Sequence, residues 1–144
     1  MSQPGAAVLV LCTGNSCRSQ ITEAFLRKHA EGRFAVYSAG TEPAEEIHPL
    51  VHVVMAEKAV ELTDQRPKSY REFLGKIPVH TVIIVCDGAA KACPSVWPGV
   101  VERLMWPTED PAAFVGEGDE TLERFRQVRD ELETRVLAWL GSGD

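Results

Sequence analysis

The chain has 144 residues, 44% of them hydrophobic, and 15 Lys and Arg against 21 Asp and Glu give a formal net charge of −6. This length predicts one domain over residues 1–144 around a single core. The acidic balance and the absence of a basic cluster argue against a nucleic-acid partner, and no segment has the pattern of a signal peptide or a membrane span. We therefore expect a cytoplasmic, monomeric protein without membrane contact.

Apolar patterning predicts alternating strands and helices. Continuous apolar runs predict strands that are buried on both faces, and apolar residues at helical spacing predict amphipathic helices. The expected elements in chain order are a strand at 6–11, a helix at 19–30, a strand at 34–38, a helix at 49–62, strands at 81–85 and 101–106, and a helix at 121–140. This order predicts a doubly wound α/β sheet, whose ligands lie beyond the carboxyl ends of the strands.

The turn between the first strand and the first helix carries a thiol, Cys12, and a guanidinium, Arg18. A thiolate surrounded by backbone N–H groups at a helix N-terminus can attack a tetrahedral oxyanion. We expect Arg18 both to bind the oxyanion and to stabilise the charge that builds up in the transition state. The candidate oxyanion-binding residues are Thr13, Gly14, Asn15, Ser16, Cys17 and Arg18.

The side chains of this turn suggest further roles. Gly14 supplies a position free of Cβ strain and Asn15 tolerates a left-handed conformation, so that the turn can curl around an ion. Ser19 can donate a hydrogen bond to the Cys12 thiolate. The thiol of Cys17 lies in the first helical turn and is interpreted as a packing group without a catalytic role.

Asp110 follows the fourth strand and is the candidate general acid, which would protonate the leaving oxygen. Glu109, Asp87 and Asp119 are alternative proton donors. The four cysteines do not have the spacing of a zinc site, and no histidine is placed to complete one, so no metal is predicted.

The Cys-x5-Arg-Ser motif directly after the first strand resembles the low-molecular-weight tyrosine phosphatase family, and the resemblance covers nearly the whole chain. Gln20 and Ala112 stand where the phosphatases usually carry proline and tyrosine, and Cys86 and Cys93 are extra thiols. These features are similar to the thioredoxin-coupled arsenate reductases of the family. The resemblance implies a four-stranded parallel sheet in the order 2-1-3-4 with helices on both faces, no bound cofactor, and thioredoxin as the external reductant.

The resemblance also implies a reaction. Cys12 attacks arsenate, with phosphate as a competing oxyanion, and Cys86 then attacks the Cys12 sulfur, so that arsenite leaves and a disulfide forms. Cys93 next displaces Cys12, and thioredoxin reduces the Cys86–Cys93 disulfide. Seven residues of helix rise about 10 Å, whereas bridged Cα atoms lie within roughly 7 Å, so the segment 86–93 must bend or unwind.

Two other functions stay open. A low-molecular-weight tyrosine phosphatase would use Cys12, Arg18 and Asp110 in the same roles, and weak phosphatase activity is expected even of a reductase. A redox-regulated protein that only binds an oxyanion would show no turnover with a reductant.

Some reductases of this branch hold a potassium ion through residues similar to Asn15, Glu23 and Ser38, completed by an aspartate after the second helix. The corresponding loop of this chain has no aspartate and contains Lys68. Because a lysine beside the site would oppose cation binding, we predict no specific dependence on potassium. Alternatively, Lys68 simply points into solvent.

Overall fold

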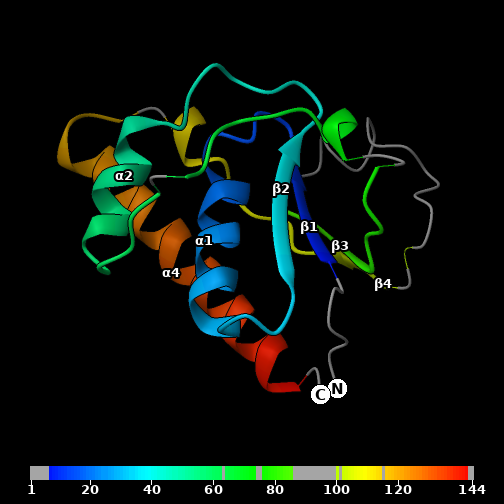
Figure 1. Cartoon of the computed structure of the whole chain (residues 1–144). Coiled ribbons are helices and arrows are strands. Elements are labelled where there is room, and N and C mark those ends of the chain that lie inside the picture. Colours follow the sequence, from blue (N-terminus) through cyan, green and yellow to red (C-terminus); the bar gives the residue numbers. More distant parts are fainter. Residues whose placement is uncertain are drawn as a thin grey trace.

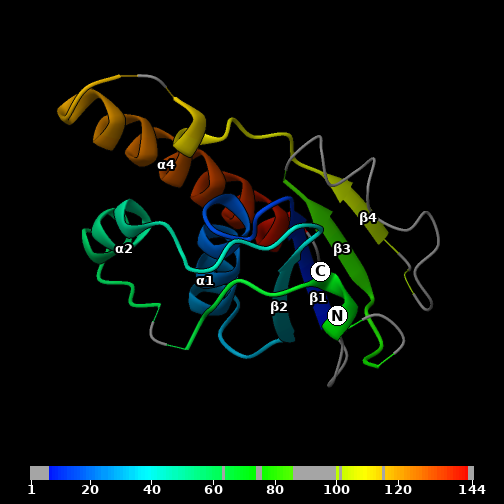
Figure 2. The same ribbon diagram turned by 90° about the horizontal axis from the view of Figure 1, so that it is seen from above.

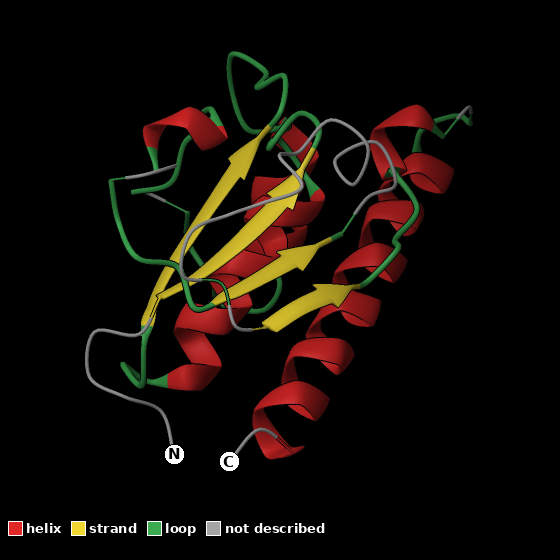
Figure 3. Cartoon of the chain, turned by 90° about the vertical axis from the view of Figure 1, so that its right-hand side faces the viewer, coloured by secondary structure: helices red, strands yellow, loops and turns green. Residues whose placement is uncertain are grey.

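The computed structural model of this chain describes residues 7–62, 64–73, 76–85, 100, 102–114 and 116–142. Its four strands are β1 (Ala7–Cys12), β2 (Ala35–Gly40), β3 (Thr81–Ile84) and β4 (Glu102–Met105). They form one parallel sheet in the order β2-β1-β3-β4, which confirms the predicted order 2-1-3-4. Figure 3 shows the four arrows pointing the same way.

Helices cover the two faces of the sheet unequally. The α-helices α1 (Arg18–Ala30), α2 (Pro49–Ala56) and α4 (Asp119–Ser142) lie on one face (Figures 1 and 2). On the other face lies the short 3-10 helix η1 (Tyr70–Glu72), and the ring of Phe73 after it contacts Tyr37 at 5.0 Å between centroids. Helices on both faces are thus present among the described residues, but the second face has only a 3-10 helix. None of the described helices is both long and apolar enough to cross a membrane.

The centre of the sheet is buried on both faces, as the apolar runs predict. All six residues of β1 are buried, and Leu9, Val10 and Leu11 have no exposed surface. β3 is also buried along its whole length, whereas three of the four residues of the edge strand β4 are exposed. Burial on both faces follows from crossover connections that cover a parallel sheet.

The long helix α4 packs against α1 and α2 through the predicted apolar stripe. Phe125, Leu132 and Val136 of this stripe are fully buried. At the margin of the layer Glu57, directly after α2, forms ion pairs with two arginines of α4, and their hydrogen bonds lower the pKa of Glu57 to about 2. Core packing therefore holds the helix layer together, with ion pairs at its edge.

α2 is shorter than predicted, whereas the other six elements end within two residues of their predicted bounds. The pattern predicts a helix over 49–62, but α2 ends at Ala56. Ala59 takes a left-handed conformation with φ of 60°, and the N–H of Val60 returns to Met55 O at 3.0 Å. Glycine usually marks such an ending. Because alanine stands there instead, the sequence had no local signal for it.

The carboxyl ends of the strands bring distant segments together. Cys12 ends β1 and pairs in register with Gly40 at the end of β2. Val85, directly after β3, donates its N–H to Leu11 O at 3.0 Å, and its own carbonyl accepts from Thr108 N at 3.1 Å. The turn after β1 and the loop after β4 therefore meet at one edge of the sheet, as expected for an open α/β sheet.

Leu132→Ala tests the packing of the helix layer, with Leu137→Ala as a control on the same helix. Leu132 is fully buried, whereas Leu137 is 47% exposed. We expect L132A to lower the free energy of unfolding by about 2–5 kcal/mol, because it removes buried methyl groups and leaves a cavity. L137A should lower it by less than about 1 kcal/mol. Urea unfolding of both variants measures the difference, and equal losses would contradict the buried face described above.

Candidate active site

Residues 12–18, between β1 and α1, are called the Cys12 loop. Each peptide carbonyl from residue 12 to residue 17 accepts a hydrogen bond. The pairs are Thr41 N to Cys12 O (3.2 Å), Glu42 N to Thr13 O (2.9 Å), Ala44 N to Gly14 O (2.9 Å), Gln20 Nε2 to Asn15 O (2.9 Å), His48 N to Ser16 O (3.1 Å) and Ile21 N to Cys17 O (2.9 Å). Four of these donors are main-chain N–H groups of the segment 41–48 after β2. This segment and the start of α1 therefore hold the whole length of the loop.

These hydrogen bonds orient the N–H groups of the loop. In a trans peptide the C=O of one residue and the N–H of the next point in opposite directions, and the described residues contain no cis peptide bond. Because the carbonyls of residues 12–17 are held outward, the N–H groups of residues 13–18 turn inward. The Asn15 N–H does so, since it lies 3.2 Å from Cys12 Sγ. Such a nest of N–H groups at a helix N-terminus suits a tetrahedral anion.

Cys12 lies at the floor of this nest and is only 2% exposed. Its Sγ is 3.1 Å from Ser19 Oγ. Asn15 Nδ2 donates to the same hydroxyl oxygen at 2.7 Å, which leaves the hydroxyl proton of Ser19 available for the sulfur. The geometry is therefore the one expected for a hydrogen bond from Ser19 to a Cys12 thiolate.

The Asn15 side chain connects the thiol to a buried carboxylate. Asn15 has a left-handed conformation with φ of 53°, as predicted. Its Oδ1 accepts from Lys68 N at 2.9 Å, which fixes the orientation of the amide. Its Nδ2 also donates to Ser38 Oγ at 3.0 Å, and Ser38 donates to Glu23 Oε1 at 2.5 Å. A continuous buried network thus runs from the site into α1.

The Arg18 side chain is 12% exposed and reaches the loop after β4. Its guanidinium donates to Thr108 O at 3.1 Å, and Nη2 lies 3.7 Å from Asp110 Oδ2. Its Nε is buried and has no hydrogen-bond partner among the described residues. Because buried N–H groups are normally paired, this donor beside the Cys12 loop indicates a position for an acceptor such as an oxyanion oxygen.

Among the described acidic candidates, Asp110 is the one beside this guanidinium. Its Oδ1 also caps the 3-10 helix η2 (Pro111–Ala113). Glu109 forms an ion pair with Arg124 at 3.2 Å, and Asp119 is exposed at the start of α4. The geometry therefore favours Asp110 as the proton donor over these two residues. Asp87 lies outside the described residues.

The Cys17 thiol is buried, and burial raises its pKa to about 11, although a hydrogen bond with Ser16 opposes the shift. A thiol with this pKa stays protonated at neutral pH, whereas the thiolate is the nucleophilic form. The environment of Cys17 therefore supports its interpretation as a packing residue, whose backbone N–H alone faces the nest.

Gly14 does not have the steric role predicted for it. It is not among the described glycines with positive φ, and a Cβ there would meet only Ser16 Oγ, at 3.5 Å. The steric requirement lies instead at Gly40, where a Cβ would overlap Thr13 O and approach Asn15 N to 3.1 Å. Because β2 and the Cys12 loop are far apart in the sequence, no local pattern could mark Gly40 as a close approach.

Lys68 does not simply point into solvent. Its side chain is half-buried, donates from Nζ to Arg66 O at 2.8 Å, and has a pKa that is lowered chiefly by burial. Nearby Glu23 pairs with Arg27 at 2.6 Å. The described part of the chain contains no group of three or more His, Cys, Asp or Glu side chains that could hold a metal ion. Independence from potassium stays a prediction.

Cys86 and Cys93, the predicted second and third thiols, lie outside the described residues. Val85 is the last described residue before Cys86, and its N–H donates to Leu11 O. Leu11 directly precedes Cys12, so the described end of β3 lies beside the start of the Cys12 loop.

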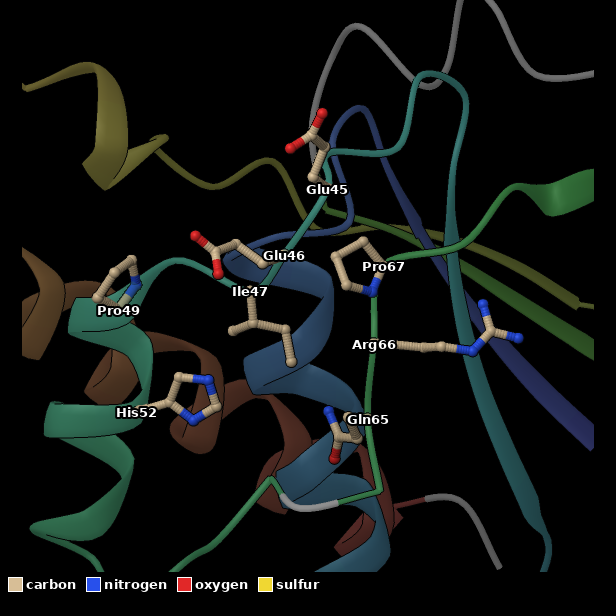
Figure 4. Close-up of a pocket in the computed structure, with 8 residues that line it drawn as sticks. All are labelled: Glu45, Glu46, Ile47, Pro49, His52, Gln65, Arg66 and Pro67. Carbon is tan, nitrogen blue, oxygen red and sulfur yellow. The ribbon is translucent and has the colours of Figure 1, made fainter.

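A cavity of about 420 Å³ lies between the segment before and within α2 and the segment 65–67 (Figure 4). It is lined by Glu45, Glu46, Ile47, Pro49, His52, Gln65, Arg66 and Pro67. None of these residues is a cysteine or belongs to the Cys12 loop. The cavity is therefore separate from the candidate reaction site, although its walls include parts of the segments that hold the loop.

This chain is similar to the low molecular weight phosphotyrosine protein phosphatases and to several arsenate reductases. The family model of the low molecular weight phosphotyrosine protein phosphatases matches residues 7–142. An arsenate reductase from Halalkalibacterium halodurans is 36% identical over 137 residues, which are 94% of this chain and 96% of that protein. An arsenate reductase from Bacillus subtilis is 33% identical over 137 residues, with the same coverage of 94% and 96%.

Solved structures have a similar fold over nearly the whole chain. A structure of an arsenate reductase in the phosphate binding state has a TM-score of 0.77 and 29% identity, and the match covers 94% of this chain and 97% of that chain. A thioredoxin-dependent arsenate reductase from Corynebacterium glutamicum has a TM-score of 0.73 and 31% identity, and the match covers 99% of this chain and 63% of that chain.

Gly40→Ala tests the close approach of β2 to the Cys12 loop. The added methyl group should displace Thr13 O and therefore turn the Gly14 N–H away from the nest. We expect the affinity for inorganic phosphate to fall roughly tenfold. Gly141→Ala is the control, because a Cβ there meets nothing within 4 Å. Calorimetric titration measures both affinities, and an unchanged affinity in G40A would contradict the steric role of Gly40.

Proposed function

Because this chain belongs to the low-molecular-weight phosphotyrosine protein phosphatase family and, within it, to the arsenate reductases, we propose that it reduces arsenate to arsenite through a relay of Cys12, Cys86 and Cys93. Thioredoxin re-reduces the relay. The observation that carries the proposal is the buried Cys12 thiol inside the nest of inward N–H groups, in a loop that ends at Arg18, whose buried Nε has no partner among the described residues. A tetrahedral oxyanion is the chemical group that such a site fits.

In the first step the Cys12 sulfur attacks the arsenic of arsenate. An S–As bond forms, and one As–O bond breaks as its oxygen leaves with a proton. We propose Asp110 as the proton donor, and its place beside Arg18 supports this role. The N–H groups of the Cys12 loop and the guanidinium stabilise the charge on the remaining oxygens.

In the second step Cys86 attacks the Cys12 sulfur. The S–S bond forms as the S–As bond breaks, and arsenic keeps the electron pair, so that As(V) becomes As(III) and two thiols become a disulfide. The pairing of Val85 with Leu11 supports this step, because each residue directly precedes one of the two cysteines. Neighbouring strands lie about 4.8 Å apart, within the usual Cα separation of a disulfide.

In the third step Cys93 displaces Cys12 from Cys86. Cys12 returns to the thiolate, and thioredoxin reduces the Cys86–Cys93 disulfide by thiol–disulfide exchange. The relative from Corynebacterium glutamicum is thioredoxin-dependent, and similar arsenate reductases have been solved in oxidized and reduced states. No bound cofactor takes part in this cycle.

Hydrolysis of phosphate monoesters is the alternative, since Cys12, Arg18 and Asp110 would serve it equally. Water can resolve a phospho-cysteine, but water cannot supply the two electrons that reduce arsenate. We propose phosphatase activity only as a weak side reaction. Turnover with a reductant also separates the reductase from a protein that merely binds oxyanions.

Cys12→Ser and Arg18→Ala should each lower arsenite production below about 1% of the parental rate, because one removes the nucleophile and the other the main oxyanion partner. The assay follows arsenite with thioredoxin and, separately, with glutathione and glutaredoxin. We expect turnover with thioredoxin. Near-normal turnover by C12S would overturn the proposal.

Asp110→Asn and Glu109→Gln form a matched pair in the same assay. D110N should lower the rate and leave phosphate affinity largely intact, because the acid acts on the leaving oxygen. E109Q should keep the parental rate, since Glu109 pairs with Arg124 instead. The reverse result would transfer the role to Glu109.

Cys86→Ser should block arsenite release yet preserve hydrolysis of a small aryl phosphate, because water still resolves the phospho-cysteine. Cys93→Ser should allow about one turnover and then accumulate a Cys12–Cys86 disulfide. Peptide mapping after alkylation detects that disulfide. Continued cycling of C93S with thioredoxin would show that the third thiol is dispensable, and loss of both activities in C86S would indicate a structural role for Cys86.

A further inference from the structure

The side-chain amide of Gln20 is fully buried, and its donors and acceptor are all engaged. Its Nε2 donates to Asn15 O at 2.9 Å and to Arg66 O at 3.0 Å. Its Oε1 accepts from Gln65 Nε2 at 2.7 Å, and the same Nε2 also donates to the Gln20 backbone carbonyl at 3.1 Å. Two backbone carbonyls thus identify the nitrogen of the Gln20 amide, and one identifies the nitrogen of Gln65, so that the orientation of Gln20 is determined by its neighbours.

Gln20 differs from the other donors to the peptide carbonyls of residues 12–17. The other five carbonyls between residues 12 and 17 are held by main-chain N–H groups, which almost any amino acid provides. The carbonyl of Asn15 is held by a side chain. Asn15 is also the residue of the loop with a left-handed backbone conformation, which is unfavourable for L-residues and therefore benefits from a hydrogen bond that holds it. A substitution at position 20 can therefore release one peptide of the loop without removing the other five bonds.

We propose that Gln20 is a positioning residue for oxyanion binding. By holding Asn15 O outward, it turns the N–H of Ser16 inward, because the two groups belong to one trans peptide and point in opposite directions. The inference rests on the proposed oxyanion-binding role of the Cys12 loop.

The same amide connects the nest to the segment 65–68. Arg66 O accepts from Gln20 Nε2, and the N–H of Lys68 holds Asn15 Oδ1. Asn15 is therefore held at its carbonyl through Gln20 and at its side chain directly by the segment 65–68. Figure 4 shows Gln65 and Arg66 of this segment at the wall of the adjoining cavity.

Gln20→Met tests the proposal, with Gln65→Met as the matched control. Q20M keeps the length of the side chain but removes both donors, whereas Q65M removes the donor to Gln20 Oε1 and leaves the bond to Asn15 O. With inorganic phosphate as the probe, we expect calorimetric titration to show roughly tenfold weaker binding in Q20M. Q65M should stay within about twofold of the parent.

Two further measurements separate positioning from general loosening of the fold. In ¹⁵N–¹H spectra, phosphate should shift the Ser16 amide proton of the parent strongly and that of Q20M weakly, whereas the shift at Gly14 should persist in both. Alkylation of Cys12 by iodoacetamide, a neutral reagent, should proceed at a similar rate in both proteins. If Q20M does not fold, Gln20→Ala gives the comparison, because it also removes the Nε2 donors and adds no charge near the anion site.

The outcomes are distinct. If the parent does not bind phosphate, the proposed function and the role of Gln20 fall together. If the parent binds phosphate and Q20M binds it equally well, or the Ser16 shift is unchanged, the role of Gln20 is overturned and the proposed function stands. Equal weakening in Q20M and Q65M would also overturn it, because a general disturbance of the segment 65–68 would then explain the loss.

Discussion

Peptide N–H groups can converge on one anion only when the carbonyls of the same peptides diverge and find donors elsewhere, and the site of this protein depends on that constraint. The segment 41–48 provides most of these donors, because four of its main-chain N–H groups bind carbonyls of the Cys12 loop. This segment follows β2, and β2 lies beside β1 in the sheet. The order of the strands therefore places a ready set of donors along the outer side of the loop.

Buried side-chain amides complete what the backbone begins. Asn15 and Gln20 have no exposed surface, and the hydrogen bonds of both side chains are satisfied on the donor and the acceptor side. A buried polar network that is fully paired favours one conformation, because each alternative leaves a polar group without a partner. The network continues through Ser38 to Glu23 on α1, so the loop and the helix are held as one unit.

Oxyanion binding and reduction place different chemical demands on the proposed site. Phosphate and arsenate present the same tetrahedral set of oxygens, so a nest of N–H groups with one guanidinium suits both. Reduction additionally requires two electrons, which the proposed thiols supply. Because β3 lies next to β1, Val85 directly after β3 lies beside the start of the Cys12 loop. The strand order thus matters for the proposed chemistry as well as for the nest.

The sequence by itself determined the strands, most helix bounds, the motif from Cys12 to Ser19 and the left-handed Asn15, because apolar periodicity and short spacings express these features locally. It did not determine the end of α2 at Ala56, because Ala59, the left-handed residue that follows, is not a glycine. Only the tertiary structure decided that Gly40 rather than Gly14 needs the absence of a Cβ, that Asp110 rather than Glu109 lies beside Arg18, and that Gln20 holds the Asn15 carbonyl. Each of these three findings depends on which groups lie next to one another in the folded chain. Most of these groups are distant in the sequence, so no local sequence pattern could specify the contacts.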